Sequence, residues 1–208
     1  MIFGLAGRAG SGKDSVAEVL RSSYGIVPMK FAQPLYEMVA VMVGCTVESL
    51  QDRTLKEIPI PAIGKSPREL LQSIGTEWGR TFVGDDVWIK SMASRSLPLR
   101  GQGISIVITD VRFDNEADWI RRTGGAVWEV ARPRHDTGCV GHAAHHASEA
   151  GIDSLLIDRT IVNDGSLGDL ADAVHRAVTA PWSGSPRSGR AARKGFRSRS
   201  DQGCRSVE

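Results

Sequence analysis

The chain has 208 residues, of which 41% are hydrophobic and 24% are charged, as in a globular protein of one or two domains. Its net charge of +2 is unevenly divided, because residues 181–208 hold seven Lys or Arg and two acidic residues, which leaves the preceding part net acidic. The three cysteines, at positions 45, 139 and 204, are far apart, which excludes a disulfide framework and predicts reduced thiols in a cytoplasm. No apolar run has the length of a signal peptide or a membrane span.

A short apolar strand, Ile2–Ala6, leads into a glycine-rich turn with the spacing Gly-x4-Gly-Lys and then into a helix. Glycines let successive backbone N–H groups point at one phosphate, and the helix adds a partial positive charge at its N-terminus. Lys13 is placed to reach the β- and γ-phosphates of a nucleotide. The motif predicts a P-loop formed by Gly7, Ala9, Gly10, Ser11, Gly12, Lys13, Asp14 and Ser15.

One position departs from the usual P-loop, because Asp14 stands where Ser or Thr normally supplies a hydroxyl to magnesium. A carboxylate could hold Mg²⁺ directly or through water. Ser15 could serve instead if the helix begins one residue later. The sequence leaves both alternatives open.

Strand and helix signals alternate to about residue 180. Strands are predicted over residues 25–31, 103–109, 126–131 and 160–162, and helices over residues 34–43, 66–80, 87–97, 114–123 and 166–178. This alternation predicts an α/β fold in which helices cover both faces of a parallel sheet. Beyond residue 181 apolar periodicity ends, and the composition is typical of a disordered tail.

The segment 66–80 has the clearest helix signals, because Ser66 and Glu69 can form a capping box around Pro67 at the first helical position. An apolar stripe is predicted from Leu70, Leu71, Ile74 and Trp78. A polar face is predicted from Arg68, Gln72 and Arg80. Two cations and an amide on one face suit a phosphate monoester, and a solvated helix face is the alternative.

Asp110 follows the apolar strand 103–109, at the edge where ligands bind in open parallel sheets. It could hold magnesium or a metal-bound water, or it could cap the helix that follows. Arg112 could touch a phosphate. Lys30 and Phe31 end the preceding strand at the same edge, where they could contact a nucleotide or be a solvated strand end and a core residue.

Residues 132–148 are polar and rich in His and Gly, and we expect them to form a mobile lid. Arg132 and Arg134 open this segment and could neutralise charge on a transferring phosphoryl group. Cys139, His142 and His145 invite a zinc interpretation, but their spacing is not that of a standard site.

Several of these blocks, in this order, resemble the deoxynucleoside monophosphate kinases of tailed bacteriophages, within the P-loop NMP-kinase group. The specific blocks are Arg-Glu-x-Leu-Gln-x-x-Gly-Thr-Glu, which begins at Arg68, and Asp-Val-Arg-Phe-x-Asn-Glu, which begins at Asp110. The other matching blocks are residues 7–15, 30–35, 146–149 and 162–165. The resemblance implies a P-loop kinase fold over residues 1–180: three layers around a parallel sheet of about five strands, with a lid.

The same resemblance implies that ATP and Mg²⁺ are used to phosphorylate a deoxynucleoside 5′-monophosphate in a host-cell cytoplasm. It implies that Lys13 and the loop hold ATP, that Arg132 belongs to the lid, and that Asn163 lies near the adenine or closes the last turn. The monophosphate site would be lined by Arg68, Gln72, Thr76, Glu77 and Arg80.

Other activities stay open at this point. The nearest is a P-loop kinase for another phosphorylated acceptor, such as phosphomevalonate or dephospho-coenzyme A. The basic tail favours a nucleic-acid-associated ATPase, but the acidic body and the lack of a recognisable DNA- or RNA-binding module count against it. A non-catalytic nucleotide-binding protein would not need Lys13 and Asp110. We therefore expect small nucleotides as partners, nucleic acid only at the tail, and no membrane, and the oligomeric state is left open.

Overall fold

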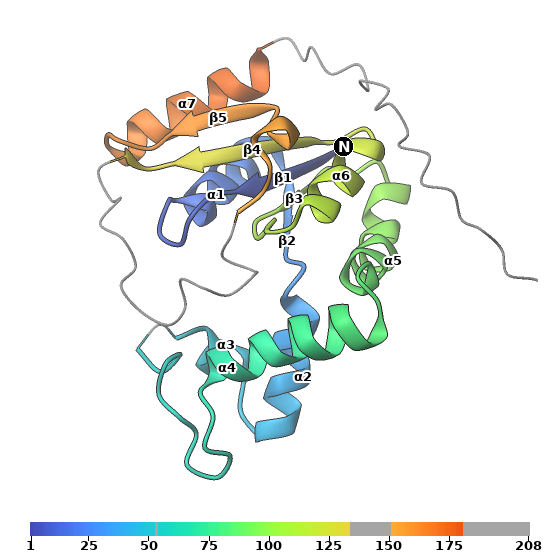
Figure 1. Ribbon diagram of the computed structural model, residues 1–208. Helices are drawn as coiled ribbons and strands as arrows, with labels where there is room; N and C mark the ends of the chain where they lie inside the picture. The colour runs from blue at the N-terminus through green and yellow to red at the C-terminus, as the bar shows by residue number, and fades with distance from the viewer. Residues whose placement is uncertain (53, 134–150, 181–208) are drawn as a thin grey trace, which may run out of the picture.

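The computed structural model describes residues 1–52, 54–133 and 151–180, and the statements below refer to these residues. They form a five-stranded parallel sheet in the order β2-β3-β1-β4-β5 with helices on both faces (Figure 1). The strands are β1 (Ile2–Ala6), β2 (Val27–Met29), β3 (Ile106–Ile108), β4 (Ala126–Ala131) and β5 (Arg159–Val162). The predicted α/β fold with about five parallel strands is confirmed.

Two apolar cores lie on the two faces of the sheet. Helices α1 (Lys13–Tyr24) and α7 (Leu167–Thr179) cover one face, where Leu20 and Val174 pack against Trp128 of β4. Helices α5 (Val87–Gly101) and α6 (Asp114–Arg122) cover the other face. β1 lies in the middle of the sheet and is buried on both sides, as its unbroken apolar sequence predicts.

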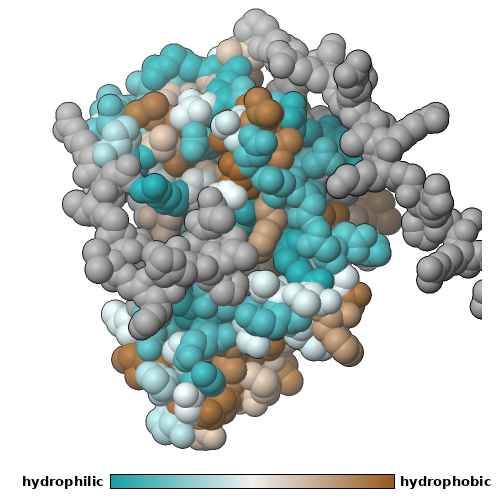
Figure 2. Space-filling model, in the orientation of Figure 1, coloured by the Kyte–Doolittle hydropathy of each residue, from teal (hydrophilic) through white to brown (hydrophobic). Residues whose placement is uncertain are grey.

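A small helical lobe is built from α2 (Gln33–Val43), α3 (Val47–Gln51) and α4 (Pro67–Gln72). These helices have a small core of their own around Val39, Leu50 and Leu71. The chain enters the lobe from the carboxyl end of β2 and leaves it towards α5, and the lobe lies below the sheet in Figure 1. Figure 2 shows hydrophobic side chains gathered at this lower end.

The predicted capping box at Ser66 is confirmed: its hydroxyl accepts from the Glu69 N–H at 3.3 Å, and a Glu69 carboxylate oxygen accepts from the Ser66 N–H at 2.8 Å. The α-helical winding lasts only to Gln72, after which Ser73–Val83 forms a π-helix, η1. The change of period explains why Trp78, predicted to be buried, is 44% exposed.

Other differences from the sequence prediction are smaller. α5 continues to Gly101 because Pro98 lies in its last turn, where the missing N–H removes only one hydrogen bond. In α2 the core contacts come from Val39 and Ala40, and the neighbouring Met38 and Met42 are exposed. A short 3₁₀ turn, η5 (Ser154–Leu156), precedes β5. None of the helices in the described part of the chain is both long and apolar enough to cross a membrane.

Candidate active site

The P-loop connects β1 to α1, and its glycines have backbone conformations that other residues rarely adopt. Gly7, Gly10 and Gly12 have φ values of 130°, 78° and 105°. A Cβ at Gly7 would come within 2.4 Å of the Val130 carbonyl oxygen. α1 then begins at Lys13, so the backbone and the helix N-terminus combine at one anion-binding loop.

Lys13 is folded back over this loop. Its Nζ donates to the carbonyl oxygens of Gly7 and Arg8 at 2.6 and 2.8 Å. The hydroxyl of Ser11 is buried and has no hydrogen-bond partner within the described ranges. A phosphate group would therefore meet an ammonium group and an unsatisfied hydroxyl in the same loop, which fits a nucleotide phosphate.

Asn163 lies behind the P-loop, directly after β5. Its side chain is buried, and its Nδ2 donates to the Ser11 carbonyl oxygen at 2.8 Å. A Cβ at Gly12 would come within 2.4 Å of that same Nδ2. The amide therefore supports the backbone of the loop, a contact that the sequence did not predict.

Asp110 joins the end of β3 to the start of α2. Its two carboxylate oxygens accept the N–H groups of Phe31 and Ala32 at 2.8 and 2.9 Å. Burial raises the pKa of Asp110, and the two N–H donors oppose that shift. The alternative that Asp110 caps the helix after it is wrong, because its carboxylate instead holds the entry to α2.

Four other predicted residues lie in or beside the P-loop: Asp14, Ser15, Lys30 and Arg132. Lys30 Nζ is 3.9 Å from Asp14 Oδ1, in a pair that is partly open to solvent. Arg132 donates to the Gly10 carbonyl oxygen at 3.5 Å, so its guanidinium lies beside the loop. Ser15 is half-buried in the first turn of α1. Arg134, the histidines at 135–146, Ser148, Glu149 and the tail lie outside the described residues.

The chemistry of these groups fits a magnesium ion that arrives with nucleotide phosphates. No group of three His, Cys, Asp or Glu side chains within residues 1–52, 54–133 and 151–180 could hold a metal by itself. Mg²⁺ bound to phosphates keeps several waters and needs only one or two protein oxygens. The carboxylate and hydroxyl oxygens of Asp14, Ser15 and Asp110 are ligands of the type that Mg²⁺ prefers.

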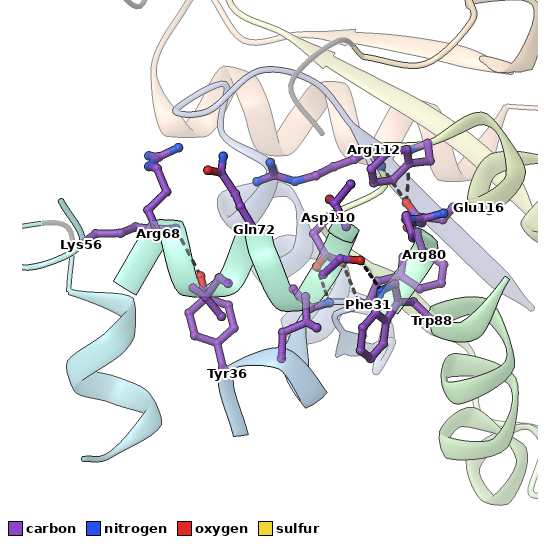
Figure 3. A pocket seen from close by; sticks show the side chains of 16 residues that line it. Phe31, Tyr36, Lys56, Arg68, Gln72, Arg80, Trp88, Asp110, Arg112 and Glu116 are labelled. Atoms are coloured by element: carbon purple, nitrogen blue, oxygen red, sulfur yellow. Dashed lines mark hydrogen bonds and ion pairs between the residues drawn. The ribbon is translucent and has the colours of Figure 1, made fainter. Parts of the chain in front are cut away.

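A pocket opens between the edge of the sheet and the helical lobe (Figure 3). Of the residues predicted from sequence, it is lined by Phe31, Arg68, Gln72, Thr76, Arg80, Asp110 and Arg112. Lys30 and Glu77 are not part of this lining, and Glu77 is exposed. The residues that sequence analysis missed include Tyr36, Lys56, Trp88, Phe113 and Glu116.

Arg80 is buried at one end of the pocket and its charge is neutralised there. Its Nη2 donates to Glu116 Oε1 at 2.5 Å, its Nη1 donates to the Asp85 carbonyl oxygen at 2.8 Å, and its guanidinium lies 3.7 Å from the centre of the Phe113 ring. The N–H groups of Arg112 and Phe113 also donate to Glu116. Burial nevertheless raises the pKa of Glu116 to about 7, against these donors.

The opposite end of the pocket carries more exposed cations. Lys56 Nζ donates to the Tyr36 hydroxyl at 3.2 Å, and Arg68 pairs with Glu57. No local pattern in the loop before α4 indicates Lys56 as a pocket residue, because it meets Tyr36 only through the packing of the lobe. Figure 3 shows Arg68 and Gln72 projecting from the same helix on the side of the pocket away from Tyr36.

Comparisons with known protein sequences identify a family for this chain. A model of the deoxynucleotide monophosphate kinase family matches residues 62–174. A protein of Acanthamoeba polyphaga mimivirus provisionally named deoxynucleotide monophosphate kinase is 30% identical, over 86% of this chain and 96% of its own. The deoxynucleoside-5′-monophosphate kinase of Escherichia phage T5 is 27% identical, over 78% of this chain and 89% of its own. The solved structure of a dephospho-CoA kinase from Campylobacter jejuni is 13% identical and aligns at a TM-score of 0.47, over 85% of this chain and 94% of its own.

Proposed function

The chain belongs to the deoxynucleotide monophosphate kinase family, and from that premise we propose that it transfers the γ-phosphoryl group of ATP to a deoxynucleoside 5′-monophosphate. The observation that carries this proposal is the pocket at the sheet edge. It combines the cations Arg68 and Arg112 with an apolar, aromatic wall, which is the combination that a nucleoside monophosphate requires.

The reaction needs no nucleophilic side chain, because a phosphate oxygen of the acceptor attacks the γ-phosphorus in line. The protein's task is to position two polyanions and to neutralise their charge. In this proposal Lys13 exchanges its two carbonyl acceptors for the β- and γ-phosphate oxygens of ATP. Arg112 and Arg132, on either side, stabilise the charge of the transferring group.

Magnesium, when bound together with ATP, would supply positive charge that neutralises part of the phosphate charge. Asp14, Ser15 and Asp110 are the residues that would hold the ion or its waters. Lys30, which lies near Asp14, belongs to the same region in this proposal and not to the acceptor pocket.

On the acceptor side, we assign Arg68, Gln72 and Thr76 to the monophosphate, since they line the pocket from one helix. The rings of Phe31, Tyr36 and Phe113 provide the wall for sugar and base. In this proposal the working unit is residues 1–180. The three separated cysteines support a cytoplasmic location.

A panel of acceptors tests this function against the rival kinases. ADP release from ATP would be followed with each of the four deoxynucleoside monophosphates, the ribonucleotides, phosphomevalonate and dephospho-coenzyme A. We expect release that depends on a deoxynucleoside monophosphate. Release only with phosphomevalonate or dephospho-coenzyme A, or release without any acceptor, would contradict the proposal.

A further inference from the structure

Four polar side chains that line the pocket recur at every fourth residue along α4 and η1: Arg68, Gln72, Thr76 and Arg80. In an α-helix each step of four overshoots one turn by about 40°, so three steps would carry the row about 120° around the axis. A π-helix takes more than four residues per turn, so the same step falls short of a turn and brings the row back. The change of winding at Ser73 therefore keeps Thr76 and Arg80 on the pocket side.

Trp88 of α5 contacts the backbone of η1 directly. Its Nε1 donates to the Gly75 carbonyl oxygen at 2.8 Å, in a buried hydrogen bond. Its six-membered ring lies against Gly79, where a Cβ would come within 2.4 Å of Cζ2. The indole is 6% exposed, so both contacts are made in the core and not at the surface.

These contacts lie beside the residues whose direction depends on the winding of η1. Gly75 and Gly79 bracket Thr76, and Arg80 follows Gly79 directly. A glycine at position 79 is the only residue that leaves room for the indole at this distance, because any Cβ would also meet the Ile74 carbonyl oxygen at 2.8 Å. The tryptophan and the glycine thus form one interlocked contact.

Resting on the function proposed above, we propose that Trp88 is a positioning residue for the acceptor site, which holds the π-helical winding of η1 so that Thr76 faces the monophosphate and Arg80 stays at the end of the pocket, bonded to Glu116. Without the indole contact, η1 loses a hydrogen bond and a packing partner at the two positions that set its winding. Trp88 contacts Gly75 and Gly79 of η1, and no P-loop residue lines the pocket, so we expect this contact to affect the acceptor more than ATP.

The test compares Trp88→Phe with a control variant on η1 in the full chain. Trp88→Phe removes the indole N–H and shrinks the ring. Phe82→Leu is the control, because Phe82 is on η1 but is 81% exposed and does not line the pocket. We expect Trp88→Phe to raise KM for the deoxynucleoside monophosphate about tenfold, the value of one lost buried hydrogen bond. KM for ATP should stay within about twofold, and Phe82→Leu should change neither constant.

A second variant keeps the proposal testable if Trp88→Phe does not fold. Gly79→Ala leaves Trp88 in place and pushes a methyl group into the same contact, so it should produce the same split between the two KM values. Equal loss for both substrates, or no change in either variant that folds, would overturn the proposal. Measurements on the wild type distinguish failure of this proposal from failure of the proposed function. If the wild type showed no acceptor-dependent ADP release, the function would be rejected and not the role of Trp88.

Discussion

Several side chains at the site are already engaged by the protein before any substrate arrives. Lys13 bonds two carbonyl groups of its own loop, and Asp110 accepts two backbone N–H groups. The substrate must therefore compete with internal partners, which makes these residues responsive to binding. Arg80 differs because it is paired with Glu116, which is also buried, so its guanidinium has a partner within the protein before any substrate binds.

Lys13→Ala should remove phosphoryl transfer and leave the fold intact. Loss of a charge contact in the transition state lowers kcat about 100-fold or more. The melting temperature should barely change, because the loop whose carbonyl groups Lys13 bonds is exposed at residues 7–10. Lys90→Ala, which removes an exposed lysine of α5, is the control and should retain full activity. Retention of more than about a tenth of kcat by Lys13→Ala would argue against the P-loop assignment.

Asn163→Ala should weaken ATP binding specifically. The variant loses the bond to the Ser11 carbonyl and the packing against Gly12, both of which hold the loop's shape. We expect KM for ATP to rise roughly five- to tenfold, from about 1 kcal/mol of lost support, with KM for the acceptor unchanged. Asp164→Ala, at the neighbouring exposed position, is the control. A rise confined to the acceptor would mean that Asn163 does not act through the P-loop.

Glu116 makes stability depend on pH in an unusual direction. Its pKa in the folded chain is raised to about 7 by burial, above the ordinary value of 4.5. A raised carboxyl pKa means that the folded state binds the proton more tightly, so this group's contribution is lost as pH rises from about 4.5 to 7. The free energy of unfolding would be measured by urea for the wild type and for Glu116→Gln at pH 5 and at pH 8. Between pH 5 and pH 8 it should fall more in the wild type than in the variant. Equal losses would show that the contacts from Arg80 keep Glu116 ionised throughout.

At the scale of elements, the sequence was informative wherever a local signal is sufficient. The capping box at Ser66, the apolar β1 and the alternation of strands and helices depend on neighbouring residues, and all were predicted. The π-helical winding of η1 was not, because it depends on Trp88, which follows η1 and contacts its backbone only in the folded chain. A helical pattern read with one period therefore placed Trp78 in the core.

The same distinction applies to the pocket. Motif residues such as Gln72 and Asp110 line it, and the sequence named them. Tyr36 and Lys56 could not be found that way, because one is on α2, the other is in the loop before α4, and only the packing of the lobe brings them together. Lys30 and Glu77 belong to matching blocks, yet they lie outside the lining.

The helix face of α4 yields a prediction about substrate discrimination. Arg68→Ala should raise KM for the deoxynucleoside monophosphate by at least tenfold and leave KM for ATP nearly unchanged, because Arg68 lines the acceptor pocket. Lys65→Ala is the control, since Lys65 is an exposed cation that pairs with Glu69 at the start of the same helix. A rise in KM for ATP alone would show that Arg68 acts at the ATP site and not at the acceptor pocket.

At the scale of the whole molecule, the five-stranded sheet, the P-loop and the pocket lining all lie within residues 1–180. α7 ends at Thr179 and buries Leu170, Val174 and Ala177 against the body. A chain that ends at residue 180 should therefore keep the kcat, both KM values and the melting temperature of the full chain. A fall in activity or melting temperature would show that the basic tail contributes to the folded body.

The helical lobe has consequences for engineering. It packs around its own core and joins the sheet body at only two points in the chain, after β2 and before α5, so it is a natural unit for exchange between relatives to retarget the enzyme. Such a chimaera would inherit two constraints from the body. The exchanged segment would include η1, so it must keep a glycine at position 79 beside Trp88. It must also keep the arginine at position 80 that pairs with Glu116, because a buried carboxylate left without its partner would destabilise the hybrid by about 3–5 kcal/mol.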